Sequence, residues 1–326
     1  MLTFSHRTQE VRYASIAFAS SASYFHPSAA QAARLCRFTL RLMGVGWSQR
    51  FSFNRAELGQ LLRRLAQYGP TTPQQRRELL PYGANKLDGY LYYLQYAGLF
   101  ERRDGKGDLT ALGRLIVEMD PGLFDIGTSF VIHYHLSGHP DATVWRLMSN
   151  VVLPQYPIFF TKEQAIRLLS SIPEIYTSPQ DKVEEDFRYF ARALSEPDAL
   201  GVADLLGVSG YEDSKGGDEG SWSSRKFRRK TPELLPALIF AYAAYDTRAK
   251  YFLGQPSISV ESFLQVPNGA GRAFHLYAKP ELLRTLVPPL RARDLLGHTR
   301  TAELDDLEFL QPSLPPLDIL RLHYTS

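Results

Sequence analysis

Basic side chains are the residues best placed to do chemistry in this sequence, and the first group of them surrounds a turn. Arg102 and Arg103 precede the dipeptide Asp104-Gly105, a strong signal for a tight turn between two strands, and Lys106 follows it. Guanidinium and ammonium groups on a projecting hairpin can pair with the phosphate oxygens of DNA. We therefore expect a basic β-hairpin that contacts a polyanion.

Three short helices are expected to position this hairpin. Asn54 and Glu57 have the spacing of a capping box, Thr72 followed by Pro73 marks the start of a second helix, and Gly98 ends a third. Another helix begins directly after the hairpin. This order of elements is typical of a winged helix-turn-helix, in which the third helix reads the DNA and the hairpin is the wing.

The reader helix supplies its own candidate contacts. Asn85 and Gln95 could meet base edges, and Lys86 could join the three cations of the hairpin on phosphate oxygens. The helix also carries one aspartate and four tyrosines, so it is less basic than most readers, and the tyrosines could pack against another part of the protein. Docking of a partner protein without DNA contact therefore stays open as an alternative.

A second basic group lies in a polar stretch rich in glycine and serine, which we expect to be a loop. Each phosphate that it neutralised would add to the salt dependence of nucleic-acid binding. A solvated loop without a ligand is the alternative interpretation. The basic residues of this group are Arg225, Lys226, Arg228, Arg229 and Lys230.

Histidines and acidic residues between positions 125 and 141 raise the question of a metal site. His133 and His135 would face nearly opposite sides of a helix, and only His135 and His139 have the four-residue spacing that lets two imidazoles converge. We interpret these histidines as core or helix-end residues. A metal-dependent nuclease that uses His135, His139 and a carboxylate is the remote alternative.

Catalysis has no visible site in the sequence. No phosphate-binding loop motif occurs, and the single cysteine, Cys36, stands on an amphipathic stretch beside Leu35 and Phe38 and is interpreted as core filler. We expect no enzyme activity, no metal and no cofactor, although a site assembled from distant residues would be invisible to this reasoning. A lone cysteine cannot form an internal disulfide and suits a reducing cytoplasm.

The composition is that of a folded protein, with 44% hydrophobic and 22% charged residues and no apolar run long enough for a membrane span. Basic residues outnumber acidic ones between residues 51 and 106, and the reverse holds between residues 171 and 220. We predict a mainly α fold, with the winged helix-turn-helix followed by a helical domain and residues 257–290 compatible with a second small helix-turn-helix-like unit. The expected segments are an N-terminal helical segment (1–50), the winged helix-turn-helix (51–120), a helical middle domain (121–210), a polar and basic loop (211–230) and a C-terminal helical domain (231–326).

Five stretches resemble an uncharacterised bacterial domain family that is often encoded beside phosphorothioate-type DNA sulfur-modification genes in phage-defence islands. They are YGANKLDGYLYYLQYAGLF, LTALGRLIVEMDPGLFDIGTSFVIHYHL, HPDATVWRLMSN, PALIFAYAAYDTR and SVESFLQVPNGAGRAFHL. The resemblance covers most of residues 80–310 and implies a DNA-binding accessory or targeting component of such a system. Its expected partners are double-stranded DNA and other defence or DNA-modification proteins, and a homo-oligomer is compatible with the sequence. The alternative is a protein-docking scaffold of the same complex.

Overall fold

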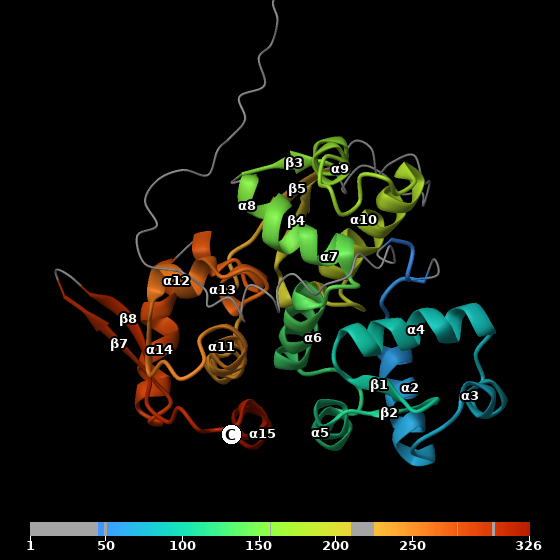
Figure 1. Ribbon diagram of the computed structural model, residues 1–326, viewed down its shortest axis with the longest axis horizontal. Coiled ribbons are helices and arrows are strands. Elements are labelled where there is room, and N and C mark those ends of the chain that lie inside the picture. Colours follow the sequence, from blue (N-terminus) through green and yellow to red (C-terminus); the bar gives the residue numbers. More distant parts are fainter. Residues whose placement is uncertain (1–44, 49–50, 157, 210–224, 279, 302–303) are drawn as a thin grey trace, which may run out of the picture. The chain divides into compact units, whose positions relative to one another are not determined.

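The computed structural model describes residues 45–48, 51–156, 158–209, 225–278, 280–301 and 304–326 (Figure 1). These residues belong to one compact unit, Met43–Ser326. Most of the helical segment expected before residue 50, including Cys36, lies outside the described residues, as do residues 210–224 of the predicted loop.

The chain up to residue 119 forms helices and a hairpin at the positions expected from their start and stop signals. Asn54 accepts a hydrogen bond from the backbone N–H of Glu57 (3.0 Å), and Thr72 and Gln75 form a complete capping box. The strands of the hairpin are antiparallel. The elements are α2 (Arg55–Tyr68), α3 (Pro73–Leu79), α4 (Ala84–Tyr96), β1 (Phe100–Arg103), β2 (Lys106–Leu109) and α5 (Ala111–Met119).

The middle of the chain combines helices with a three-stranded antiparallel sheet of order β3-β5-β4. Asp125 caps α6 by accepting from the backbone N–H of Thr128 (3.2 Å). Phe227 of β5 is fully buried and packs against the ring of Phe160 at 5.5 Å between centroids. The elements are α6 (Ile126–Gly138), α7 (Thr143–Leu147), the π-helix η1 (Met148–Val152), α8 (Leu153–Gln155), β3 (Phe160–Thr161), α9 (Lys162–Ser170), α10 (Gln180–Ser195), the 3-10 helix η2 (Gly201–Ala203), β4 (Leu206–Ser209) and β5 (Lys226–Arg229).

The C-terminal part surrounds one strongly apolar helix, α11, and adds a second three-stranded sheet of order β6-β8-β7. Most side chains of α11 are buried, as its sequence predicts. Within the described ranges, every helix is too short or too polar to cross a membrane. The elements are α11 (Ala237–Tyr251), β6 (Ser257–Ser259), α12 (Val260–Gln265), α13 (Ala270–Ala273), the 3-10 helices η4 (Leu276–Ala278) and η5 (Pro280–Leu282), α14 (Leu283–Arg291), β7 (Leu296–Arg300), β8 (Asp305–Phe309) and α15 (Pro316–Thr325).

Helix α15 packs along α11 and also reaches the start of α6. The imidazole Nε2 of His323 lies 2.9 Å from the Asp125 carboxylate, and the hydroxyl of Tyr324 lies 2.7 Å from that of Thr128. Partial burial alone would raise the pKa of Asp125, but the hydrogen bond and charge of His323 lower it. The last helix therefore closes the amino end of a helix formed nearly two hundred residues earlier.

The predicted fold class is wrong, because the chain is a mixed α/β protein with three small antiparallel sheets. Residues 226–229 form the central strand β5 rather than the loop that their composition predicts. Residues 257–290 do not form a second helix-turn-helix-like unit, since β6 pairs with β8 and thereby joins a sheet. A winged helix-turn-helix followed by helices is therefore not a description of this chain.

Candidate nucleic-acid interface

The tip of the β1–β2 hairpin carries the first predicted basic group. Asp104 and Gly105 both have positive φ, +51° and +76°, which makes the tight turn that their sequence predicts. Arg103 lies opposite Lys106 in the register of the two strands. The side chains of both residues are exposed, as is that of Arg102. Three cations therefore stand together at the end of one short hairpin.

One face of α4 is open beside this hairpin. Asn85 is exposed, and Tyr92 and Gln95 are half-buried, so the open positions recur at helical spacing along one side. The Arg102 guanidinium lies over the Tyr92 ring, 5.4 Å from its centroid. This contact joins the basic hairpin to the open face of the helix and holds Arg102 in a defined place.

Lys86, by contrast, already forms an ion pair with another residue of the protein. Its ammonium lies 2.7 Å from the carboxylate of Glu57, which also accepts a hydrogen bond from Tyr90. Partial burial alone would raise the pKa of the Glu57 carboxyl, but these two hydrogen bonds lower it. Because Glu57 turns to Lys86, it does not complete the capping box expected with Asn54. Lys86 therefore adds less positive charge to this surface than the hairpin residues do.

The other tyrosines of α4 pack inside the chain. Tyr93 is fully buried, donates to the backbone carbonyl of Phe51 (3.2 Å) and meets the ring of Trp47 edge-on. Tyr96 stacks on His139 with centroids 4.4 Å apart. The tyrosine-rich side of α4 is thus covered by the protein itself, which leaves Tyr92 as the tyrosine on the open face.

A buried arginine of α3, which no sequence motif indicates, packs against the hairpin. Arg76 of α3 is 3% exposed, hydrogen-bonds the Thr71 carbonyl and lies over the Phe100 ring at 5.5 Å. Thr71 in turn pairs with Gly107 of β2 through two backbone hydrogen bonds. Burial, followed by the nearby charge of Arg102, lowers the pKa of Arg76. These contacts fix the hairpin relative to α3.

The second predicted basic group lies on and beside strand β5, which points its side chains to two different faces. Lys226 and Arg228 are exposed, whereas Arg225 is 8% exposed. Arg229 donates to the Leu153 carbonyl (3.2 Å) and to Tyr277, and Lys230 pairs with a neighbouring carboxylate. Strand geometry sends alternate side chains to opposite faces, so the five basic residues do not form one continuous patch. Strand β5 pairs with β3 and β4, whereas the β1–β2 hairpin packs on α2 and α4. The two basic groups therefore belong to different sheets.

The histidines of α6 are core and helix-end residues, as the sequence analysis interprets them. His133 is fully buried between the Ala273 carbonyl (2.9 Å) and the indole N–H of Trp145 (3.2 Å). Burial lowers its pKa to about 4. His135 lies 2.7 Å from the Tyr242 hydroxyl, and His139 ends the helix. Among the described residues, no three His, Cys, Asp or Glu side chains converge as metal ligands.

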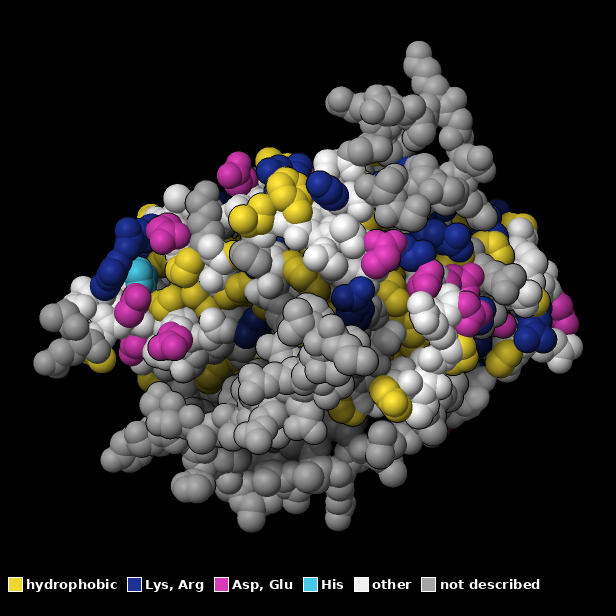
Figure 2. Space-filling model, turned by 90° about the horizontal axis from the view of Figure 1, so that it is seen from above, with side chains coloured by type: hydrophobic (Ala, Val, Ile, Leu, Met, Phe, Trp, Pro, Cys, Tyr) yellow, Lys and Arg dark blue, Asp and Glu magenta, His cyan; other side chains and the backbone are white. Residues whose placement is uncertain are grey.

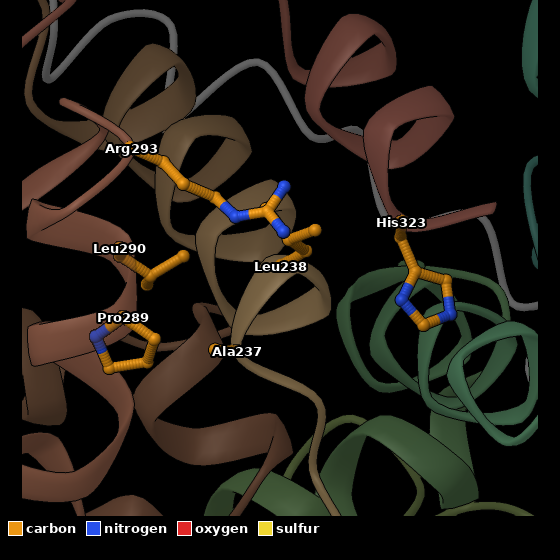
Figure 3. Close-up of a pocket in the computed structure, with 6 residues that line it drawn as sticks. All are labelled: Ala237, Leu238, Pro289, Leu290, Arg293 and His323. Atoms are coloured by element: carbon orange, nitrogen blue, oxygen red, sulfur yellow. The ribbon is translucent and has the colours of Figure 1, made fainter. Parts of the chain in front are cut away.

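A pocket of about 180 Å³ lies where α11 begins (Figure 3). Arg293 extends over Leu238 toward the side on which His323 lies, and these two side chains bring the polar atoms. His323 is paired with Asp125, and Arg293 donates to the Ser326 hydroxyl (3.2 Å). We assign no function to this small, mostly apolar pocket. Its lining residues are Ala237, Leu238, Pro289, Leu290, Arg293 and His323.

Comparisons with known proteins place the chain in a family and identify similar folds. None of the curated proteins compared with the chain matches it. The chain is similar to two solved structures titled "Magnesium ion-bound SspB crystal structure" and "SspB crystal structure". The first has 17% identity and a TM-score of 0.65 and covers 87% of this chain and 90% of that chain. The second has 18% identity and a TM-score of 0.62 and covers 86% and 88%.

At these identities the two structures show a shared fold. The model of one domain family matches residues 75–324, which include all five stretches that carry the resemblance to an uncharacterised family. The match covers well over half of the chain. The chain therefore belongs to the family described as "Protein of unknown function (DUF4007)".

Proposed function

We propose that this protein is a DNA-binding accessory or targeting component of a bacterial DNA-modification or phage-defence system. The observation that carries the proposal is the cluster of three exposed cations, Arg102, Arg103 and Lys106, beside the open face of α4. Phosphate contacts of this kind supply most of the affinity of a protein for DNA and fix its position on the duplex.

In this proposal, the hairpin binds the phosphate backbone and α4 faces the groove. Asn85 is the exposed amide on this face that can exchange hydrogen bonds with base edges, whereas Gln95 is half-buried with its Oε1 covered, so only its Nε2 can take part. The ion pair between Arg103 and Glu101 (2.8 Å) is exposed, so it is weak and a phosphate can replace the carboxylate. Arg102 keeps its position through Tyr92 and needs little ordering on binding.

The link to DNA modification rests on family resemblance. The resemblance associates this family with phosphorothioate-type modification genes, and the similar solved structures are both titled SspB. One of them is bound to magnesium. The described part of this chain has no cluster of three metal-ligating side chains, and the proposed DNA contact does not involve a metal ion.

The test is a titration of fluorescent duplex DNA at several salt concentrations, with Mg²⁺ and with EDTA. We expect Arg102→Glu/Arg103→Glu/Lys106→Glu to weaken binding at least about tenfold and to reduce the slope of log affinity against log salt by up to about 3. The matched control is Arg284→Glu/Arg291→Glu/Arg300→Glu, which makes the same change in charge on exposed residues of the C-terminal part. The control should bind more tightly than the hairpin variant.

Equal affinity of the two triple variants would overturn the hairpin as the DNA contact. Absence of duplex binding by the unmodified protein at low salt would favour the scaffold alternative. In that case, the open face of α4 with Tyr92 would be the first surface to examine for a partner protein.

A further inference from the structure

The outer face of the β3-β5-β4 sheet carries cations and an aromatic ring in adjacent rows. Lys226 of β5 lies between Thr161 of β3 and Ser209 of β4 in the register of the sheet. In the next row, Arg228 is paired with Gly207, and its guanidinium lies 5.9 Å from the centroid of the Phe159 ring. The two exposed cations of β5 therefore lie on the same face as an aromatic ring.

This ring is open to solvent. Phe159 is 47% exposed and the preceding Ile158 is 65% exposed, whereas Phe160 is buried in the core. The sheet lies near the top of Figure 1, and Figure 2, which views the molecule from that side, shows Lys and Arg side chains next to hydrophobic ones. Arg228 lies over part of this ring, and the exposed remainder is aromatic surface on which a base can stack.

Gly207 has no side chain, and the side chains of two of the cations pack closely against it. A Cβ atom at this glycine would lie 3.1 Å from Lys230 Cε and 3.7 Å from Arg228 Nε, so both basic side chains flank the same point of the sheet. Lys230 also pairs with Asp204 at 2.6 Å, and this pair is partly exposed to solvent. Arg228 and Lys230 therefore lie side by side on this face of the sheet, and Arg228 is the more exposed of the two.

We propose that this face, composed of Phe159, Lys226, Arg228 and Lys230 around Gly207, binds an unpaired DNA strand. The phosphates lie along the exposed cations Lys226 and Arg228, with Lys230 beside them, and a base stacks on Phe159. In duplex DNA the base faces are covered by neighbouring bases, whereas an unpaired strand offers both the face and the phosphates. The inference rests on the proposed function in taking DNA as the ligand, but it uses a different surface.

The test compares labelled oligo(dT) of about 12 nucleotides, within the range of known single-strand sites, with a blunt duplex. Phe159→Ala should weaken oligo(dT) binding about tenfold and leave duplex binding unchanged. Phe159→Tyr keeps the stacking face and should bind like the unmodified protein. Phe124→Ala, which removes a 75% exposed aromatic side chain elsewhere, is the matched control and should have no effect.

Charge reversal gives a second, independent measure. Lys226→Glu/Arg228→Glu should reduce the salt slope of oligo(dT) binding by about 1.4, the value for two phosphate contacts on a single strand. The hairpin variant Arg102→Glu/Arg103→Glu/Lys106→Glu should retain this binding. Retained oligo(dT) affinity in Phe159→Ala, or an equal loss on duplex, would overturn the single-strand site. Loss of duplex binding in the hairpin variant alone would still support the proposed function.

Discussion

Both basic segments of this protein are rich in Lys and Arg in the sequence, but the structure exposes the cations of one and buries or pairs several of the other. At the β1–β2 hairpin, Arg102, Arg103 and Lys106 all remain exposed at the turn. In the segment around β5, the more densely charged of the two, Arg225 is buried and Arg229 is bonded to backbone and tyrosine oxygens. A run of cations in a sequence therefore does not measure the charge that a surface presents.

The difference follows from where each segment lies in its sheet. The end of a two-stranded hairpin projects into solvent, so side chains near the turn can avoid the core on either face. A central strand has neighbours on both sides and a core behind it, so alternate residues must enter the interior. Phe227 shows this directly, since it lies between two exposed cations and is fully buried.

The largest effect that would test this comparison is on stability. Phe227→Ala removes a ring packed against Phe160 and Phe187, and it should lower the free energy of unfolding by about 3–5 kcal/mol. Phe124→Ala, at an exposed ring, should lower it by less than about 1 kcal/mol. Urea denaturation of both variants measures the difference. Similar values for the two would show that β5 is not anchored in the core as described.

An intermediate effect should come from pH, because His275 lies behind β5. Its Nδ1 donates to the Lys230 carbonyl (3.3 Å), and burial, with a smaller contribution from His133, lowers its pKa to about 3. The unfolded chain takes up this proton near pH 6.5, so stability is full above that value and falls as the pH is lowered from 6.5 toward 3.

We expect a loss of about 2 kcal/mol from His275 between pH 7 and pH 5, measured by urea denaturation at each pH. His275→Gln, which cannot be protonated, should remove that part of the pH dependence even if its overall stability is lower. An unchanged pH dependence in this variant would contradict the assignment.

The smallest effect compares two neighbours on one strand. Arg229→Ala removes hydrogen bonds to Leu153 and Tyr277 and should destabilise the protein by about 1–2 kcal/mol. Arg228→Ala, one residue earlier on the exposed face, should change stability by less than about 0.5 kcal/mol. Thermal unfolding of the pair checks this alternation. The reverse order would mean that the faces of β5 have been assigned the wrong way round.

The first part of the fold could be predicted because its signals are local. Asn54, Thr72 and Thr110 cap helices, and Asp104-Gly105 makes the hairpin turn, all within a few residues of the elements that they define. The strands that the sequence patterns do not predict are short, and β4 and β6 each pair with a strand that no tight hairpin joins to them. Residues 210–225 separate β4 from its partner β5, and residues 260–304 separate β6 from its partner β8, so no local pattern predicts these pairings.

The residues of the candidate sites also fall into those with a local sequence signal and those without one. The hairpin cations could be named from the turn that they flank, whereas Phe159 stands next to another phenylalanine and gives no sign that one ring is buried and the other exposed. The alternation of basic residues with Phe227 was the available signal for β5, but the glycine-rich and serine-rich surroundings favoured a loop. Arg76 could not be found from sequence, because its role depends on the distant Phe100.

The closure of α6 by α15 has a consequence for how the protein is made. Asp125 leaves the ribosome 198 residues before His323, and Thr128 precedes Tyr324 by 196. During synthesis, the residues that bond to the amino end of α6 are therefore added only after most of the chain has been translated. The apolar α11, which packs between α6 and α15, stays uncovered on one side for the last part of that interval. The nascent chain should accordingly need protection from aggregation until α15 has been translated.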